Sequence, residues 1–215
     1  MTLEAQLCLG ALIGFASGSL PFGYWAGRLR GIDIRQHGSG NIGATNVIRV
    51  LGKGIGVPVF ILDLCKGLLP CLGVAAWMQA SGVEGEMLSA GRVLTGMMAI
   101  LGHMFTPWLN FRGGKGVATA AGVLLGIAPW AMLGGLVAWL VFFFLTRYVS
   151  LASMMAGVGV VVTMVVRMVQ NGRWDVVQLS FGVILAVLVI VRHRSNISRL
   201  IAGTESKAGG GKAKG

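Results

Sequence analysis

The fold of this 215-residue chain is decided by residues 117–146, which read VATAAGVLLGIAPWAMLGGLVAWLVFFFLT. The stretch has no charged residue, and a helix of this length would be about 45 Å long, against about 30 Å for a hydrocarbon core. It is too long for one upright crossing and short for two. Pro129 lies near its middle and Gly134 and Gly135 follow, so we expect the helix to break or turn there.

The composition indicates that the whole chain is embedded in a membrane. AVILMFWYC residues make up 55% of it, charged residues only 12%, and there are 35 glycines. An ordinary soluble domain has about twice this share of charged residues. The composition therefore excludes a soluble enzyme, a secreted disulfide scaffold and a disordered protein.

Five further apolar segments, each close to the roughly twenty residues that a crossing needs, flank the central stretch. They are residues 5–27, 54–83, 93–111, 148–166 and 176–191. Asp63 and Lys66 interrupt the second of them. Because ionisable residues at membrane depth seldom stay single, we expect these two to pair in a structural role, with a substrate role second.

The basic residues decide how often residues 117–146 cross. The net charge is +11, and the Lys and Arg residues outside the spans divide nine to eight between the two faces for one crossing, but fourteen to three for two. Only the second division satisfies the positive-inside rule. We expect an all-α polytopic integral membrane protein with about seven short transmembrane helices, the N-terminus outside and the C-terminus cytoplasmic. Residues 1–205 would form one membrane-embedded domain and residues 206–215 a flexible basic tail.

This orientation places three polar segments on the cytoplasmic face. The first, residues 33–54, reads DIRQHGSGNIGATNVIRVLGKG. Its glycines can turn backbone N–H groups toward an anion, and Arg49 can bind one with two hydrogen bonds. The candidate residues are Gly38, Ser39, Gly40, Asn41, Thr45, Asn46 and Arg49. The alternative is an ordinary Gly/Asn turn with a helix cap at Thr45 or Asn46. An anion-binding loop explains the many hydrogen-bond donors better than such a turn does.

The second segment, residues 111–122, reads FRGGKGVATAAG. Gly113, Gly114 and Gly116 surround Lys115 just before an apolar helix start, an arrangement that suits a phosphate. A basic turn between two membrane helices explains the pattern equally well. We expect His103, in the preceding span, to hydrogen-bond a neighbouring helix rather than to approach this segment.

The third segment, residues 192–205, reads RHRSNISRLIAGTE. His193 and Asn196 fall on one helical face, although a histidine at the lipid boundary is more often a polar anchor than a catalyst. Glu205 is the only acid in the last thirty residues and could hold the segment by pairing with an arginine. Ser150 and Ser153 could donate into the same site, but serines in membrane helices usually bond their own backbone.

The chain lacks residue patterns that several kinds of catalytic site require. The three aspartates Asp33, Asp63 and Asp175 are far apart in sequence, and no Cys/His cluster exists, so no metal site is expected. No histidine begins a His-x4-Asp dyad. A site with many positively charged and neutral hydrogen-bond donors but few basic side chains suits a reaction between two anionic, phosphate-bearing substrates, one of which carries a good leaving group.

Six motifs make the sequence similar to a known family nearly end to end. They are SLPFG (19–23), GSGNIGATNVIRVLGK (38–53), DLCKG (63–67), HMFTPWLNFRGGKGVAT (103–119), YVSLAS (148–153) and HRSNISRLIAGTE (193–205). The chain resembles the bacterial membrane glycerol-3-phosphate acyltransferases that use acyl-phosphate as donor, the PlsY family.

The resemblance implies a seven-helix protein of the bacterial cytoplasmic (inner) membrane whose site faces the cytoplasm. It implies acyl transfer from acyl-phosphate to the 1-hydroxyl of glycerol 3-phosphate, giving lysophosphatidic acid and phosphate, the first step of phospholipid synthesis. Membrane lipids and the soluble enzyme that forms acyl-phosphate would be partners, with no cofactor and no nucleic acid. The implied catalytic residues are Ser39, Arg49, Lys115, His193 and Asn196, with Glu205 structural.

The sequence leaves three questions open. The alcohol proton could go to His193 or to a substrate phosphate, in either case without an acyl-enzyme. An organic-phosphate or anion transporter could use the same basic Gly-rich loops, although the outside loops offer no matching site. A lipid-binding structural protein without turnover is the third alternative.

Overall fold

The computed structural model describes residues 1–209, which contain helices and turns and no strand. The expected all-α architecture is confirmed. Residues 210–215, most of the predicted basic tail, lie outside the described residues. By its internal contacts the chain divides into two compact units, Met1–Pro129 and Trp130–Gly215.

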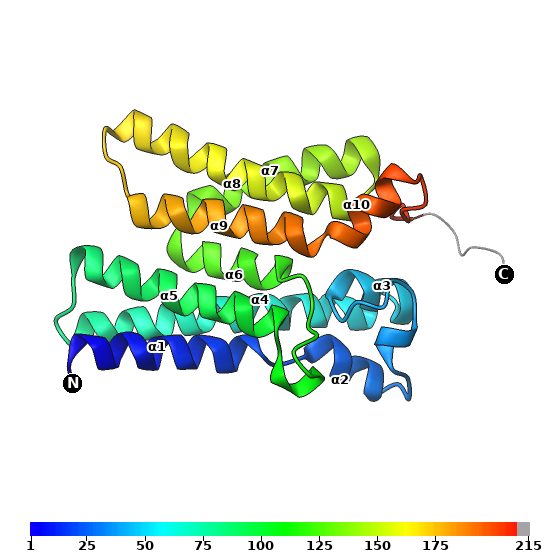
Figure 1. Cartoon of the computed structure of the whole chain (residues 1–215), viewed down its shortest axis with the longest axis horizontal. Helices are drawn as coiled ribbons and strands as arrows, with labels where there is room; N and C mark the ends of the chain where they lie inside the picture. The colour runs from blue at the N-terminus through cyan, green and yellow to red at the C-terminus, as the bar shows by residue number, and fades with distance from the viewer. Residues whose placement is uncertain (210–215) are drawn as a thin grey trace. The chain divides into compact units, whose positions relative to one another are not determined.

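The first unit contains six α-helices and two short 3-10 helices (Figure 1). In chain order they are α1 (Leu3–Gly18), α2 (Phe22–Arg28), η1 (Ile34–Gln36), α3 (Ala44–Leu51), α4 (Lys53–Ala80), α5 (Gly85–Met104), η2 (Pro107–Leu109) and α6 (Val117–Ile127). α1, α4 and α5 pack against one another, and α4 also packs against α3 and α6.

Glycines allow α1 and α5 to approach at backbone distance. Gly14 and Gly18 lie one turn apart on the buried face of α1. A Cβ on Gly14 would overlap the carbonyl oxygen of Thr95, and one on Gly18 would overlap that of Ala99. Between helices surrounded by lipid, such close packing replaces the hydrophobic effect as a source of association.

The apolar segment predicted over residues 5–27 lies within the candidate span Leu3–Arg28, but the structure interrupts its helix at residues 19–21. Pro21 has no N–H, and it disfavours helical geometry in the residue before it. Thr106 donates to the Ser19 carbonyl at 2.6 Å, and Lys66 Nζ donates to the Leu20 carbonyl at 2.7 Å. These bonds satisfy the two carbonyls at the break, which the helix does not continue through.

The break expected within residues 117–146 is present. α6 ends at Ile127, and α7 (Pro129–Thr146) begins at Pro129, a favourable residue for the first position of a helix. Gly134 and Gly135 lie inside α7 and do not interrupt it.

The second unit consists of α7, α8 (Val149–Asn171), α9 (Val176–Arg192) and α10 (Arg194–Ile201) (Figure 1). α8 packs on α9, where Gly157 lies against Ala186. α9 and α10 meet at His193 with a bend of 57°.

Within residues 1–209, five helical stretches are long and apolar enough to cross a membrane, or six if α9 and α10 count as one bent span. The stretch Leu3–Arg28 is one of the five despite its break. α6 has 11 residues and is shorter than a full crossing requires. The described helices are therefore compatible with a polytopic membrane architecture.

Candidate active site

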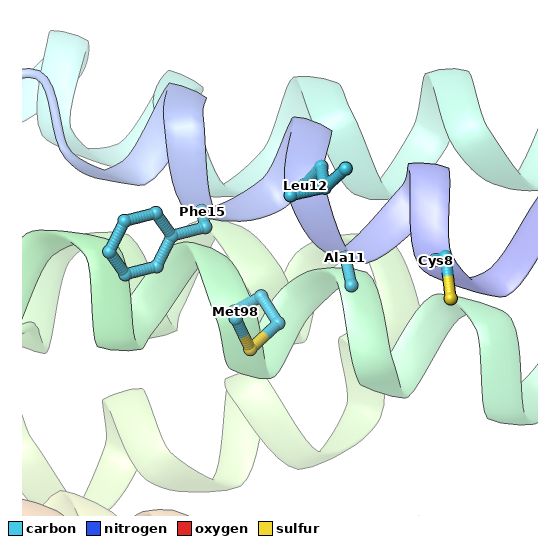
Figure 2. A pocket seen from close by; sticks show the side chains of 5 residues that line it. All are labelled: Cys8, Ala11, Leu12, Phe15 and Met98. Atoms are coloured by element: carbon cyan, nitrogen blue, oxygen red, sulfur yellow. The ribbon is translucent and has the colours of Figure 1, made fainter.

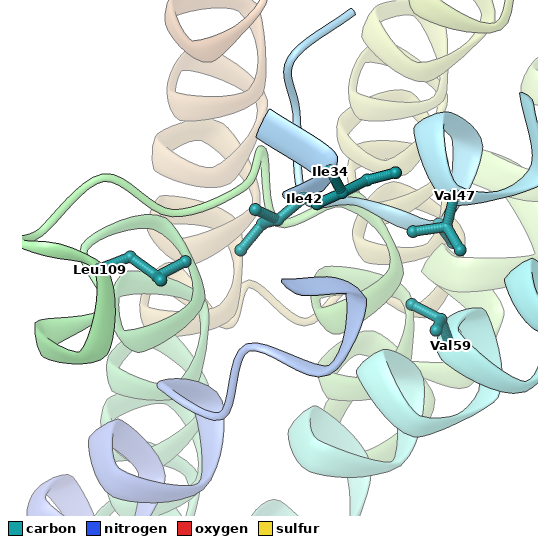
Figure 3. Close-up of a cluster of buried hydrophobic side chains, with 6 residues drawn as sticks. Ile34, Ile42, Val47, Val59 and Leu109 are labelled. Atoms are coloured by element: carbon teal, nitrogen blue, oxygen red, sulfur yellow. The ribbon is translucent and has the colours of Figure 1, made fainter. Parts of the chain in front are cut away.

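A buried apolar cluster anchors the polar segment between α2 and α3. Ile34, Ile42 and Val47 of this segment and of α3 pack with Val59 on α4 and Leu109 after α5. Figure 3 shows these side chains converging from separate segments of the first unit. The segment is therefore fixed at both ends, while its middle, residues 36–40, is exposed.

The side chain of Asn46 organises the exposed middle of this segment. Asn46 is only 1% exposed, and its Nδ2 donates to the carbonyls of His37 and Asn41 at 3.0 and 2.9 Å. Its Oδ1 accepts from the Ser39 N–H at 2.8 Å. The sequence suggested that Asn46 caps a helix or offers a donor to an anion, but Gly43 is the N-cap of α3. Asn46 instead holds the main chain of the loop.

Position 38 requires glycine, because the Asn46 side chain lies directly beside it. It has φ +61, a conformation that side chains disfavour, and a Cβ there would overlap the Asn46 Oδ1 atom. Ser39, the next residue, is fixed through its main chain and is exposed. Arg49, in the last turn of α3, is also exposed.

The remaining candidates in the first segment have different roles. The Asn41 Oδ1 atom accepts from the Gly43 N–H at 2.8 Å, so this side chain shapes the turn before α3. Gly40 has φ +69, and Thr45 is exposed in the first turn of α3. Of the donors that the sequence offered, Ser39, Thr45 and Arg49 are therefore the exposed ones.

Sequence reasoning missed the ion pair at the start of this segment. Asp33 binds Arg35 at 2.6 Å between Oδ2 and Nη2 and also accepts from the Arg35 N–H. The hydrogen bond from the Arg35 side chain lowers the pKa of Asp33 to about 2. An aspartate two positions before an arginine, at the start of a short helix, is the sequence signal that could have predicted this ion pair.

The glycines of the second segment lie against α5. Gly113 N–H donates to the Met104 carbonyl and Gly114 N–H to the His103 carbonyl, both at 3.1 Å. A Cβ on Gly113 would overlap the His103 carbonyl oxygen, and one on Gly114 would overlap the His103 ring. We expected these N–H groups to point at a phosphate. In the structure they bond the loop to the end of α5.

The turn into α6 brings Lys115 next to the start of that helix. Gly116 is the N-cap of α6, with φ +79, and Lys115 is partly buried. The first-turn N–H groups of a helix have no partner within the helix. The donors that suit an anion here are therefore the start of α6 and the Lys115 side chain, rather than Gly113 and Gly114.

A buried polar cluster lies behind this loop. Asp63 Oδ1 and Lys66 Nζ are 2.7 Å apart, which is the ion pair that the sequence predicted. His103 Nδ1 lies 3.8 Å from the same Asp63 oxygen. We expected His103 to contact a neighbouring helix and not the second loop, but its ring lies against Gly114 as well.

In the second unit, His193 occupies the bend between α9 and α10. It is 3% exposed, and its Nδ1 lies 2.7 Å from the Val189 carbonyl oxygen. A carbonyl can only accept, so Nδ1 carries the proton in this contact. Nε2 is then the basic nitrogen of the neutral ring.

Glu205 gathers the residues around Asn196. Its Oε1 accepts from Asn196 Nδ2 at 2.6 Å and from Ser150 Oγ at 2.7 Å, while its Oε2 binds Arg199 at 2.7 Å. Burial raises the pKa of Glu205, but these three hydrogen bonds together outweigh it and lower the pKa. The sequence anticipated an arginine partner. The Asn196 donor is directed at Glu205, and Ser150 was not anticipated in this role.

Ser153 is bonded to its own helix. Its hydroxyl donates to the Val149 carbonyl at 2.8 Å and accepts from Trp139 Nε1 at 3.4 Å. This is the usual arrangement of serine in a membrane helix. The substrate contact that the sequence suggested for Ser153 stays a prediction.

The first unit also has an apolar groove. It is lined by Cys8, Ala11, Leu12, Phe15 and Met98 of α1 and α5 (Figure 2). It contains none of the predicted site residues and no polar group to orient a ligand.

The candidates thus fall into two sets. Ser39, Arg49 and Lys115 belong to the first unit, and His193, Asn196 and Glu205 belong to the second. Within residues 1–209, no three His, Cys, Asp or Glu side chains gather as a metal site would require.

Comparison with known proteins decides the family. The family model described as glycerol-3-phosphate acyltransferase matches residues 8–203. The chain belongs to the glycerol-3-phosphate acyltransferase family. Relatives of that name include one from Anaeromyxobacter sp., 44% identical over 90% of this chain and 92% of the relative. Another, from Aquifex aeolicus, is 40% identical over 91% and 96%.

Solved structures of a glycerol-3-phosphate acyltransferase have the same fold. PlsY (YgiH), an integral membrane protein, matches in its glycerol 3-phosphate form with a TM-score of 0.81 and 38% identity, over 94% of this chain and 96% of that chain. Its lysophosphatidic acid form matches with a TM-score of 0.78 and 37% identity, over 94% and 95%. Both the family and these structures identify an acyltransferase, and they give the transporter alternative no support.

Proposed function

We propose that this protein transfers an acyl group from acyl-phosphate to the 1-hydroxyl of glycerol 3-phosphate, giving lysophosphatidic acid and phosphate. The observation that carries this proposal is the similarity to one acyltransferase in two forms, one with glycerol 3-phosphate and one with lysophosphatidic acid. These two compounds are the acceptor and the product of the proposed reaction. Acyl-phosphate is inferred as the donor from the sequence motifs. The sequence also lacks clustered carboxylates for a metal ion and a His-x4-Asp dyad, which suits a donor that is already activated.

The first unit would bind phosphate groups. Lys115 at the start of α6 and Arg49 in α3 supply positive charge, and the α6 N-terminus adds its dipole. Ser39 is exposed on a main chain held by Asn46, so its hydroxyl can donate to an oxygen on which negative charge develops. Gly113 and Gly114 serve this site through their fit against α5 rather than as anion donors.

The second unit would supply the group that accepts the proton of the acceptor hydroxyl. The Nδ1 contact with Val189 leaves Nε2 of His193 as the proton acceptor. Glu205 and Ser150 hold Asn196 beside it, at the start of α10. We assign the base to His193, and a substrate phosphate is the alternative outcome of the test below.

In the proposed reaction the acceptor oxygen attacks the acyl carbonyl carbon. The C–O bond to phosphate breaks, phosphate leaves with that electron pair, and the acceptor proton passes through His193 to the departing phosphate. Because acyl-phosphate is already activated, direct transfer needs no covalent acyl-enzyme. Trapping an acyl group on Ser39 with donor alone would contradict this step.

We further propose seven crossings, with the N-terminus outside, the C-terminus cytoplasmic, and the site on the cytoplasmic face of the inner membrane. The charge asymmetry and the break at Ala128 support two crossings within residues 117–146. α6 alone is about 16 Å long, so its flanking residues must extend that crossing. Single cysteines at the exposed positions Gln36, Ser81, Asn171 and Thr204, in a cysteine-free background, test this with an impermeant reagent. Labelling of Ser81 and Asn171 alone in intact cells is expected, whereas labelling of Ser81 and Thr204 would contradict it.

The reaction itself is tested with purified protein, acyl-phosphate and glycerol 3-phosphate, without added metal. Lysophosphatidic acid should accumulate, with glycerol as an inactive control acceptor. No product from protein shown to be folded would contradict the proposal.

A further inference from the structure

The strongest unexplained feature of the first unit is the buried cluster of Asp63, Lys66 and His103. All three are at most 4% exposed. Replacing a buried ion pair by apolar residues is often neutral or stabilising, so stability alone is a poor explanation for it. Its position suggests another role, because His103 touches the loop that carries Lys115.

The contact between His103 and the loop is made twice. The His103 carbonyl accepts from the Gly114 N–H at 3.1 Å, and the His103 ring lies so close to Gly114 that a Cβ there would overlap Nε2. Lys115 is the next residue. The position of the ring therefore sets how near the loop can come to the end of α5.

The other side of the ring faces the ion pair. His103 Nδ1 lies 3.8 Å from Asp63 Oδ1, and that oxygen binds Lys66 Nζ at 2.7 Å. Lys66 Nζ is also fixed, since it donates to the Leu20 carbonyl at the break between α1 and α2. A fixed carboxylate on one side and a glycine main chain on the other leave the ring little freedom.

We propose that His103 is a positioning residue, which together with Asp63 and Lys66 sets the distance of the 112–116 loop from α5 and thereby places Lys115 for the phosphate of glycerol 3-phosphate. The proposal rests on the proposed function of Lys115 in acceptor binding. Loss of His103 should therefore weaken acceptor binding without removing any group that reacts.

The test is a kinetic comparison of His103→Gln, Gly114→Ala and Lys115→Ala. For the first two, KM for glycerol 3-phosphate should rise on the order of 10-fold, since small misplacements of binding groups have effects of this size or larger. Their kcat and their KM for acyl-phosphate should stay within about threefold of the parent values. Thr95→Val, a near-isosteric change at a buried position two turns earlier in α5, is the matched control and should change neither constant.

The outcomes separate this proposal from the function on which it rests. If Lys115→Ala leaves KM for glycerol 3-phosphate unchanged, the proposed role of Lys115 fails. If Lys115→Ala raises that KM but His103→Gln and Gly114→Ala do not, the positioning role is overturned and the proposed function stands. A fall in kcat alone in the His103 variant also overturns it.

Gly114→Ala still tests the proposal if His103→Gln does not fold, because it retains all three side chains of the buried cluster and acts at the contact between Gly114 and the His103 ring. A double variant adds a second criterion. If both changes act through the same contact, their combined effect on KM should be clearly less than the product of the single effects. Multiplicative effects would contradict the proposed contact.

Discussion

The buried amide of Asn46 holds the main chain of Ser39, with 2.8 Å between Asn46 Oδ1 and the Ser39 nitrogen. The Nδ2 atom of the same side chain donates to the carbonyls of His37 and Asn41. One side chain thus fixes both sides of the exposed loop segment. The position of the Ser39 hydroxyl should therefore depend on a side chain that is itself buried.

Replacing Asn46 tests this dependence. Asn46→Ala removes the hydrogen-bond partner of three part-buried main-chain groups, and since an unpaired polar group costs at most about 1–3 kcal/mol when buried, we expect a lower thermal unfolding temperature and a loss of kcat/KM of at least about 10-fold. Asn41→Ala removes a single hydrogen bond from a less buried side chain and should have a smaller effect on both measurements. Equal effects of the two substitutions would show that Asn46 does not organise the loop.

Gly38 and Gly31 form a matched pair for the same loop. Both have positive φ, but a Cβ on Gly38 would overlap Asn46, whereas nothing lies within 4 Å of a Cβ on Gly31. Gly31→Ala should cost only the backbone strain, about 1–2 kcal/mol. Gly38→Ala should cost more in unfolding free energy and should also reduce activity. Comparable activity of the two variants would argue against the Gly38–Asn46 contact.

The role of His193 as proton acceptor is tested with two substitutions, one to an amide and one to alanine. Asn can replace the Nδ1 donor to Val189 but offers nothing at Nε2, so His193→Asn should keep the fold and lose about 100-fold in kcat. His193→Ala should lose at least as much. If His193→Asn stays within a few-fold of the parent, the substrate phosphate is the base.

The lowered pKa of Glu205 predicts how the second unit responds to acid. A carboxylate whose pKa is lower in the folded state than the usual value of 4.5 stabilises the fold above that value, and the contribution is lost as the pH falls below it. Thermal unfolding of the parent protein should therefore shift downward more steeply below pH 4.5 than that of Glu205→Gln. The pKa of Asp33 is also lowered, so part of the decrease in unfolding temperature with falling pH should remain in both proteins. Identical slopes would contradict the role of Glu205.

Sequence alone identified the all-α class, the long apolar helical segments and some of their interactions. The break before Pro129 and the pairing of Asp63 with Lys66 follow from local rules about proline and about charges at membrane depth. The break at residues 19–21 did not follow, because it depends on the distant partners Thr106 and Lys66.

The candidate site was predictable in its residue types but not in their individual roles. A Gly-rich, Asn-rich loop is equally consistent with N–H groups that face an anion and with groups that bond to the protein. Only the tertiary contacts reveal that Asn46, Gly113 and Gly114 belong to the second kind. His103 was assigned to a neighbouring helix because the fold of the 112–116 loop back onto α5 leaves no periodic signal.

The most direct test of the central claim is a donor comparison with the purified protein. Acyl-phosphate and acyl-CoA of the same chain length are offered in parallel with glycerol 3-phosphate, and lysophosphatidic acid and inorganic phosphate are both quantified. We predict product from acyl-phosphate only, with one phosphate released for each lysophosphatidic acid formed. Product from acyl-CoA alone, or no product from either donor in folded protein, would contradict the account.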